Sequence, residues 1–211
     1  DTDIERNNLD WLESQPWTTL FVDGNHSNFD RLKKLPVAEW NGGTVHKIRP
    51  HIIHLMRGQV FTIDGKTFFT FGGAQSHDIR DGILETDDPR IAEWQYDYCK
   101  MFRINHISWW QEEIPSQKKM DEGIENLAEY GNKVDYIITH CPPTKILDVM
   151  NMSRGFFDKL KPDRLTDYLQ EIQENIQYKG WYCGHMHENN RYKDDINVLY
   201  HNIIEIGGDA Q

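Results

Sequence analysis

The sequence predicts an α/β fold in which strands and helices alternate at both ends of the chain around a β-rich middle. Short runs of β-branched and apolar residues, such as 18–22 and 135–139, have the composition of buried strands. Other segments carry apolar residues three and four positions apart, which is the spacing of an amphipathic helix. This combination is typical of mixed sheets covered by helices.

The first part of the chain begins with a predicted helix over 4–12. Pro16 ends this helix, because proline cannot continue the helical hydrogen-bond ladder. The strand over 18–22 then leads into a sharp turn at 23–26, and a short helix over 29–35 follows.

The middle of the chain is rich in strands. Asp64-Gly65 indicates a hairpin turn, because glycine tolerates the positive φ that such turns need. The segment 72–117 lacks a regular pattern, and we interpret it as an insertion with some helix. The predicted strands cover 44–48, 51–56, 60–63 and 67–71.

The last part of the chain returns to alternating strands and helices. Ser116 is a candidate N-cap for a helix that Gly131 closes. After the strand over 135–139, a second helix presents one apolar face. A strand over 181–183 follows, and a closing β-hairpin is expected from strands near Asn190 and over 198–206. The apolar face of the second helix consists of Leu165, Tyr168, Leu169, Ile172 and Ile176.

The length of 211 residues fits one domain, which we place at 1–211 with an irregular insertion at about 72–117. The chain carries 34 acidic and 23 basic residues, for a net charge of −11. Such a surface repels phosphate backbones, so long nucleic acid is not an expected partner. A small phosphorylated substrate or nucleotide remains compatible if a metal supplies local positive charge.

The cysteines and the apolar runs bear on the cellular compartment. The three cysteines, Cys99, Cys141 and Cys183, are an odd number in a chain too long to need disulfide staples. No segment resembles a signal peptide or a membrane span, so no membrane partner is expected. A cytoplasmic location is the expectation.

Three turns at strand ends carry the residues with metal-binding chemistry. They are Gly24-Asn25-His26, Thr139-His140 and Gly184-His185-Met186-His187. Strand ends in mixed sheets point loop side chains into one crevice. On an extended Gly-His-x-His segment, the two imidazoles point the same way and bind one ion or one ion each. Imidazole suits zinc, iron, manganese or nickel, and an amide oxygen suits harder ions.

In this order, the three turns resemble the last three motifs of the calcineurin-like metallophosphoesterase superfamily. The family pattern is Asp-x-His, Gly-Asp-x-x-Asp, Gly-Asn-His-Asp/Glu, (Gly/Thr)-His and Gly-His-x-His. The resemblance spans 18–206, and the phrases at 21–26 and 137–143 are similar to bacterial or phage members. It implies two packed mixed β-sheets flanked by helices, here without the N-terminal strand–helix–strand unit. The uncovered sheet edge makes a homo-oligomer conceivable.

The resemblance also implies a role for each matching residue. Asn25, His140 and His185 would hold one metal, and His187 would hold the other. His26 would be the catalytic residue that stabilises the transition state and protonates the leaving oxygen. Two divalent ions, each manganese, iron, zinc or nickel, would hydrolyse a phosphomonoester or phosphodiester through a bridging hydroxide.

Two departures from the family pattern leave a second interpretation open. No Asp-x-His or Gly-Asp-x-x-Asp precedes Asn25, and Ser27 stands where the family has a carboxylate that orients the histidine. Asp23 or Asp30 is a candidate to replace that carboxylate. The alternative is a truncated, catalytically impaired family member that acts as a binding or regulatory module.

Weaker candidates have structural explanations of their own. His77 and Arg80, in the loop after a predicted strand, are candidate substrate contacts or else part of an exposed loop with a salt bridge. Cys141 and Cys183 beside the histidines could instead form a closed structural zinc site. Trp109-Trp110 could form a substrate platform or a lid, or simply pack in the core. The remaining histidines are expected on the surface or in packing: His46, His51, His54, His106 and His201.

Overall fold

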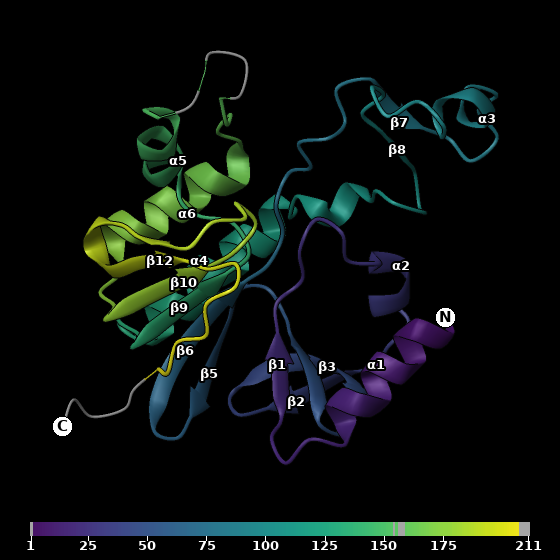
Figure 1. Ribbon diagram of the computed structural model, residues 1–211. Helices are drawn as coiled ribbons and strands as arrows, with labels where there is room; N and C mark the ends of the chain where they lie inside the picture. Colours follow the sequence, from purple (N-terminus) through teal and green to yellow (C-terminus); the bar gives the residue numbers. More distant parts are fainter. Residues whose placement is uncertain (1, 154, 156–158, 207–211) are drawn as a thin grey trace.

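The computed structural model describes residues 2–153, 155 and 159–206. Two main sheets lie side by side, and a small two-stranded sheet projects from them (Figure 1). The strands are β1 (Thr19–Phe21), β2 (Val37–Trp40), β3 (Gly43–Arg49), β4 (Ile52–Leu55), β5 (Gln59–Ile63), β6 (Lys66–Phe71), β7 (Gly82–Leu84), β8 (Phe102–Ile104), β9 (Tyr136–Thr139), β10 (Gly180–Cys183), β11 (Asn190–Arg191) and β12 (Ile196–Val198). The helices are α1 (Asp3–Glu13), α2 (Phe29–Leu32), α3 (Ile91–Trp94), α4 (Gln117–Glu129), α5 (Thr144–Asn151) and α6 (Arg164–Asn175), with short 3-10 turns η1 (Gln111–Glu113) and η3 (Lys193–Asp195).

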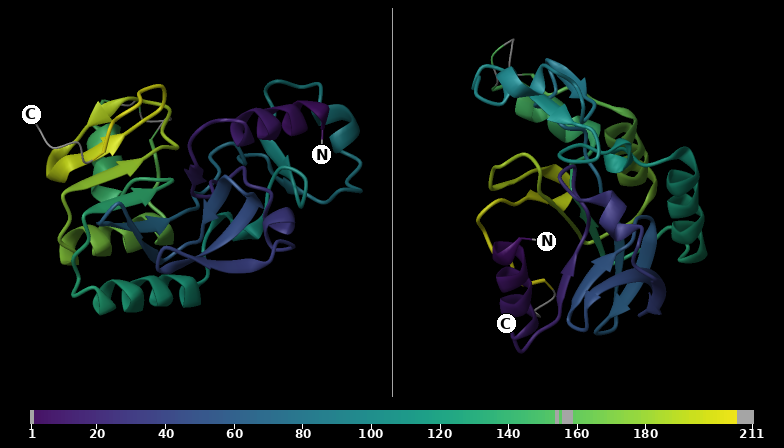
Figure 2. Two further views of the ribbon diagram at one scale, coloured as in Figure 1. Left: turned by 90° about the horizontal axis from the view of Figure 1, so that it is seen from below. Right: turned by 90° about the vertical axis from the view of Figure 1, so that its right-hand side faces the viewer.

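The first sheet has the strand order β1-β4-β3-β2. Strand β1 runs parallel to β4, and the other pairs are antiparallel. One face packs Val45, Ile53 and Leu55 against Phe61 of β5, which joins the two main sheets. Helix α1 lies beside this sheet (Figure 2). Strand β1 is therefore an edge strand whose carboxyl end is directed toward the boundary between the sheets.

The second sheet has the order β11-β12-β10-β9-β6-β5. Its central strands β6, β9, β10 and β12 are parallel, so their carboxyl ends lie along one edge. Helices α4, α5 and α6 cover this sheet and bury the main core against it. The fully buried members include Phe69, Leu127, Ile137, Leu169 and Trp181. This sheet provides the rigid platform for the turns after β9 and β10.

A buried carboxylate connects the two sheets with the insertion. Asp23, separated from the end of β1 by Val22, is 2% exposed and receives hydrogen bonds from His54 Nε2 at 3.1 Å and Arg57 Nε at 2.9 Å. Its carbonyl oxygen accepts from the Gly73 N–H after β6 at 2.8 Å. Arg57 also donates to the carbonyl of Glu112 at 2.8 Å. Burial alone would raise the pKa of Asp23, but the charge of Arg57 and these hydrogen bonds lower it.

The mixed α/β class and most elements are confirmed. Ser116 caps α4 through the N–H of Lys119 at 3.4 Å, and Gly131 follows α4 with φ of +67°. Helix α6 has the predicted apolar face and begins at a capping box formed by Asp163 and Thr166. The predicted insertion contains β7, α3, β8 and η1, and Trp110 is packed at 2% exposure.

Three local predictions were incomplete or wrong. Strand β2 and helix α5 were not predicted, because each is short and gives little periodic signal. The strand predicted over 198–206 is wrong, since β12 ends at Val198 and Ile203 beyond it is 99% exposed. The predicted hairpin exists as the short β11–β12 pair.

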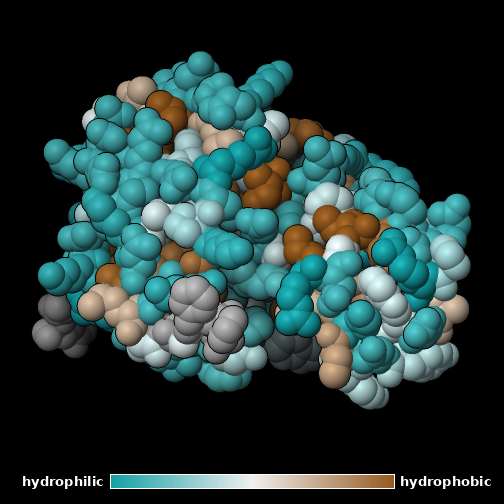
Figure 3. Space-filling model, turned by 90° about the horizontal axis from the view of Figure 1, so that it is seen from above, coloured by the Kyte–Doolittle hydropathy of each residue, from teal (hydrophilic) through white to brown (hydrophobic). Residues whose placement is uncertain are grey.

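Figure 3 shows a face that is largely hydrophilic, with separate hydrophobic patches between polar residues. Within the described residues, no helix combines the length and the apolar composition that crossing a membrane requires.

Core packing against α6 predicts a large difference between two isoleucines. Ile172 is 0% exposed in the main core, whereas Ile203 is 99% exposed. We expect Ile172→Ala to lower the free energy of unfolding by about 2–5 kcal/mol, because it leaves a cavity. The matched control Ile203→Ala should change it by less than about 0.5 kcal/mol. Urea denaturation measures both, and equal losses would contradict the assigned core.

Candidate metal centre

A pocket of about 450 Å³ lies where the turns after β1, β9 and β10 meet the loop after β6. Each turn is fixed to its neighbours by the backbone. The N–H of Gly184 donates to the carbonyl of His140 at 2.9 Å, and the N–H of His140 donates to that of Phe71 at 3.3 Å. The lining residues are Asn25, His26, His77, Asp78, His140, Leu160, His185, Met186, His187 and Tyr200. The structure therefore brings the predicted residues Asn25, His26, His140, His185 and His187 to one pocket.

The side chain of Asn25 is buried and oriented by three contacts. Its Nδ2 donates to Ser76 Oγ at 3.2 Å and to His26 Nε2 at 3.3 Å. Its Oδ1 faces His140 Nε2 at 3.2 Å. The amide nitrogen is therefore used by Ser76 and His26, and the amide oxygen is turned toward His140.

Ser76 in turn is held by Glu113, a residue that the sequence interpretation missed. Ser76 Oγ donates to Glu113 Oε2 at 2.6 Å, and Ser76 N–H donates to Oε1 at 3.1 Å. Glu113 is only 2% exposed, and this burial raises the pKa of its carboxyl group. The Glu113–Ser76 pair lies behind Asn25 and fixes the orientation of its amide.

His140 and His185 are neutral imidazoles at neutral pH. Burial lowers the pKa of His140 to about 4, and burial together with the neighbouring His140 lowers that of His185 to about 2. Their ring centroids are 5.1 Å apart. Metal binding requires deprotonated imidazole nitrogen, so burial favours the form that binds an ion.

Gly24 allows the ring of His140 to pack against the backbone of the turn after β1. A Cβ at residue 24 would lie 2.7 Å from Cε1 and Nε2 of His140. Glycine is therefore required because the imidazole packs directly on the backbone.

The expected geometry of the Gly-His-x-His turn is wrong. The segment is not extended: His185 and His187 have φ of 63° and 53°, and Met186 N–H donates back to Gly184 at 2.7 Å. Met186 is 9% exposed and belongs to the core, so the chain bends to bury it. As a result His185 faces His77, while His187 stacks on Tyr200 at 4.8 Å between ring centroids.

Neither carboxylate expected to replace the one absent at Ser27 pairs with His26. Asp23 binds Arg57 and His54, and Asp30 accepts from Trp110 Nε1 and pairs with His106, both at 2.8 Å. Ser27 Oγ instead accepts from the Gly24 N–H at 2.9 Å.

The carboxylate in the lining of the pocket is Asp78, which was not among the residues selected from the sequence. Burial would raise the pKa of Asp78, but its pairing with Arg103 and, more weakly, the charge of His26 lower it. Asp78 therefore stays ionised close to the mouth of the pocket.

The two weaker substrate candidates lie in different places. His77 lines the pocket, with Nε2 at 2.8 Å from His185 Nε2. Arg80 does not line it: its exposed side chain donates to the carbonyl of Cys99 at 3.4 Å and lies 3.8 Å from Asp81.

The donor atoms in the pocket are of the chemical types that bind one divalent ion. Asn25 offers an amide oxygen, and His140 and His185 offer neutral nitrogens, a set suited to the metals named above. Within the described residues, no group of three His, Cys, Asp or Glu side chains is already arranged to hold an ion. Cys141 and Cys183 are buried in the core, where burial raises the pKa of both thiols, so they do not support a closed zinc site.

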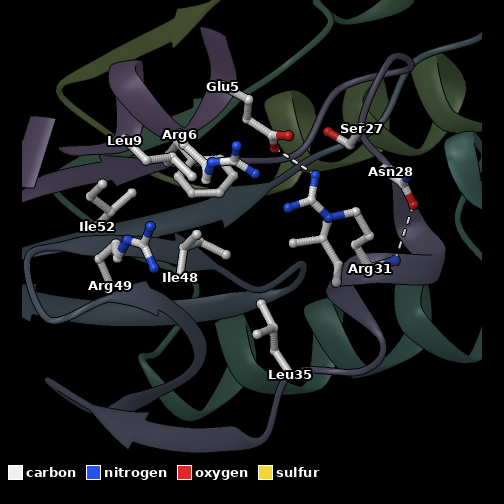
Figure 4. A pocket seen from close by; sticks show the side chains of 12 residues that line it. Glu5, Arg6, Leu9, Ser27, Asn28, Arg31, Leu35, Ile48, Arg49 and Ile52 are labelled. Carbon is white, nitrogen blue, oxygen red and sulfur yellow. Dashed lines mark hydrogen bonds and ion pairs between the residues drawn. The ribbon is translucent and has the colours of Figure 1, made fainter. Parts of the chain in front are cut away.

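A larger pocket, about 550 Å³, lies between α1, α2 and the first sheet (Figure 4). It contains none of the metal-binding motif residues. The arginines at its rim are paired within the chain, Arg31 with Glu5 at 2.5 Å and Arg49 with Asp10 at 3.6 Å. The smaller pocket is therefore the better candidate for chemistry.

Two curated proteins are similar to most of this chain. The lariat debranching enzyme of Drosophila melanogaster is 22% identical over 184 residues, covering 82% of this chain and 29% of that enzyme. That of Drosophila pseudoobscura pseudoobscura is 22% identical over 186 residues, with the same shares of 82% and 29%. The chain thus spans less than a third of the length of these relatives. No family model matches the chain, and no solved structure matches it significantly.

The close approach at Gly24 predicts a specific displacement. We expect Gly24→Ala to push the ring of His140 away by several tenths of an ångström, because the new Cβ would lie 2.7 Å from it. Gly184→Ala is the matched control, since its Cβ would meet only backbone oxygens at 3.7 and 3.8 Å. Crystal structures of both variants measure the shift, and an unmoved ring in Gly24→Ala would refute the contact.

The raised pKa of Glu113 predicts a pH dependence of stability. The pKa of Glu113 in the folded chain lies above the unfolded value of 4.5. As pH rises from the unfolded pKa to the folded pKa, the contribution of Glu113 to folding stability therefore falls. Glu113→Gln removes this effect, and the stability of the variant relative to the parent should therefore improve as pH rises. Urea denaturation across this pH range measures the difference, with Glu129→Gln on the exposed end of α4 as control. A pH-independent difference for Glu113→Gln would argue against the assigned burial.

Proposed function

We propose that this chain is a metal-dependent phosphoester hydrolase of the metallophosphoesterase type, with a calcineurin-like fold. The observation that carries the proposal is the meeting of Asn25, His140 and His185, from three separate strand ends, in one pocket beside His26. The distant similarity to lariat debranching enzymes supports the same class of hydrolase.

Each residue has a proposed role. Asn25, His140 and His185 would hold one divalent ion, and His187 would contribute to a second. When bound, the ions would supply Lewis-acid stabilisation of the phosphoryl group and a hydroxide nucleophile near neutral pH. His26 is exposed at the pocket mouth, 3.3 Å from the Asn25 amide, and donates a proton to the leaving oxygen. Asp78 contributes a negative charge to the lining of the same pocket.

The proposed substrate is a small phosphodiester, phosphomonoester or nucleotide. The net charge of −11 opposes binding of a long phosphate backbone. The name of the relatives describes debranching of a lariat, which makes a short branched phosphodiester a reasonable test substrate. A pocket of about 450 Å³ is of the size that small-molecule sites occupy.

One feature favours the second candidate function, a catalytically impaired binding or regulatory module. The Ser27 hydroxyl is used by the turn itself, and neither Asp23 nor Asp30 orients His26. Such a module would bind metal or phosphate without turnover, so binding and activity need separate measurement.

The proposal predicts that metal binding and turnover depend on different histidines. His185→Ala should weaken binding of Mn²⁺ at least about tenfold and abolish activity, because it removes a donor. His26→Ala should keep the metal but lose about 100- to 10,000-fold in kcat, because it removes the proton donor. Calorimetry measures binding, and hydrolysis of bis(4-nitrophenyl) phosphate and 4-nitrophenyl phosphate measures turnover.

The control is His51→Ala, which removes an exposed histidine on the β3–β4 turn. If His185→Ala binds Mn²⁺ as tightly as His51→Ala does, the hydrolase proposal fails. Normal metal binding without turnover in the parent chain would favour the module instead.

A further inference from the structure

The loop after β6 brings an additional imidazole to the pocket. The ring nitrogens Nε2 of His77 and His185 face each other at 2.8 Å, and the ring centroids are 4.7 Å apart. His77 is exposed and comes from a segment 108 positions away from His185 in sequence. In the sequence, this position was a candidate substrate contact and was not assigned as a metal ligand.

Both neighbours of His77 are anchored. Ser76 before it binds the buried carboxylate of Glu113 through its N–H at 3.1 Å and its hydroxyl at 2.6 Å. Asp78 after it pairs with Arg103, whose Nε donates at 2.9 Å. The backbone at residue 77 is therefore held from two sides, and the imidazole is presented from a fixed point of the loop.

Two imidazole nitrogens at this distance share one proton, because a neutral ring has one donor and one acceptor nitrogen. A divalent cation competes for the same lone pairs. Imidazole nitrogens lie about 2.0–2.1 Å from zinc, so two of them on a tetrahedral ion stand about 3.4 Å apart. The rings need to separate by only a few tenths of an ångström, and exposure of His77 leaves room for this movement.

We propose that His77 is a ligand of the divalent ion held by His185, with Asn25 and His140 completing the donor set. The observation that carries it is the pair of facing nitrogens of His77 and His185. His140 is also next to His185, with ring centroids 5.1 Å apart, and its Nε2 lies 3.2 Å from Asn25 Oδ1. This inference rests on the proposed function, since it adds a ligand to the same site.

The experiment counts histidine ligands with Co²⁺ alone, without substrate. Co²⁺ is titrated into the full chain, its affinity is measured by calorimetry, and the hyperfine-shifted imidazole N–H resonances are counted by proton NMR. We expect His77→Ala to lower Co²⁺ affinity about tenfold or more and to remove one shifted resonance. His51→Ala should match the parent in both readouts, and urea denaturation verifies that each variant is folded.

The outcomes separate this inference from the proposed function. If His77→Ala retains the parent affinity and resonance count while His185→Ala loses Co²⁺, the role of His77 is refuted and the metal site stands. If neither substitution changes Co²⁺ binding, both proposals fail. If His77→Ala keeps the parent Co²⁺ affinity and resonance count, but a separate assay finds a raised KM for bis(4-nitrophenyl) phosphate, His77 contacts substrate and is not a metal ligand.

Discussion

The ion pair between Asp23 and Arg57 is the interaction on which the arrangement of this molecule depends. It is buried, and it joins the end of β1 to the segment after β4, to the Gly73 backbone after β6 and to the carbonyl of Glu112. Removing one partner of such a pair typically costs 3–5 kcal/mol, because an uncompensated charge stays buried. The turn that carries Asn25 begins at the next residue. Its position relative to the second sheet is therefore set by electrostatics inside the protein as well as by apolar packing.

Local sequence patterns predicted the elements with strong periodicity or clear caps. Helix α6 has both, and α4 has a serine cap and a closing glycine. Strand β2 is a half-exposed edge strand, and α5 is an eight-residue helix, so neither carries a long pattern. The tail after β12 is rich in isoleucine, which is typical of a strand, but Ile203 and Ile204 are exposed and pair with no strand of the described sheets. Composition alone does not reveal whether a neighbouring strand exists.

For the candidate site, the three ordered motifs predicted which side chains would meet in one pocket. They did not predict how these side chains would be oriented. Glycine or threonine followed by Asn or His after an apolar run marked the three turns. The bend at His185 could not be predicted, because it follows from burial of Met186 in a core built by distant segments. The same holds for Glu113 and Arg103, which act across 37 and 25 positions and belong to no local motif. The insertion holds many charged residues, so neither of these two stands out in the sequence.

The wide separation of the pocket residues has a consequence for the order of folding events. Asn25 meets His140 across 115 positions and Ser76 across 51, and His185 meets His77 across 108. Contacts of this range form late, since loop-closure entropy opposes them until the sheets have docked. A cation cannot gather these donors in an unfolded or half-folded chain. It would therefore bind only after the pocket has assembled, so that it slows the unfolding rate and leaves the folding rate nearly unchanged.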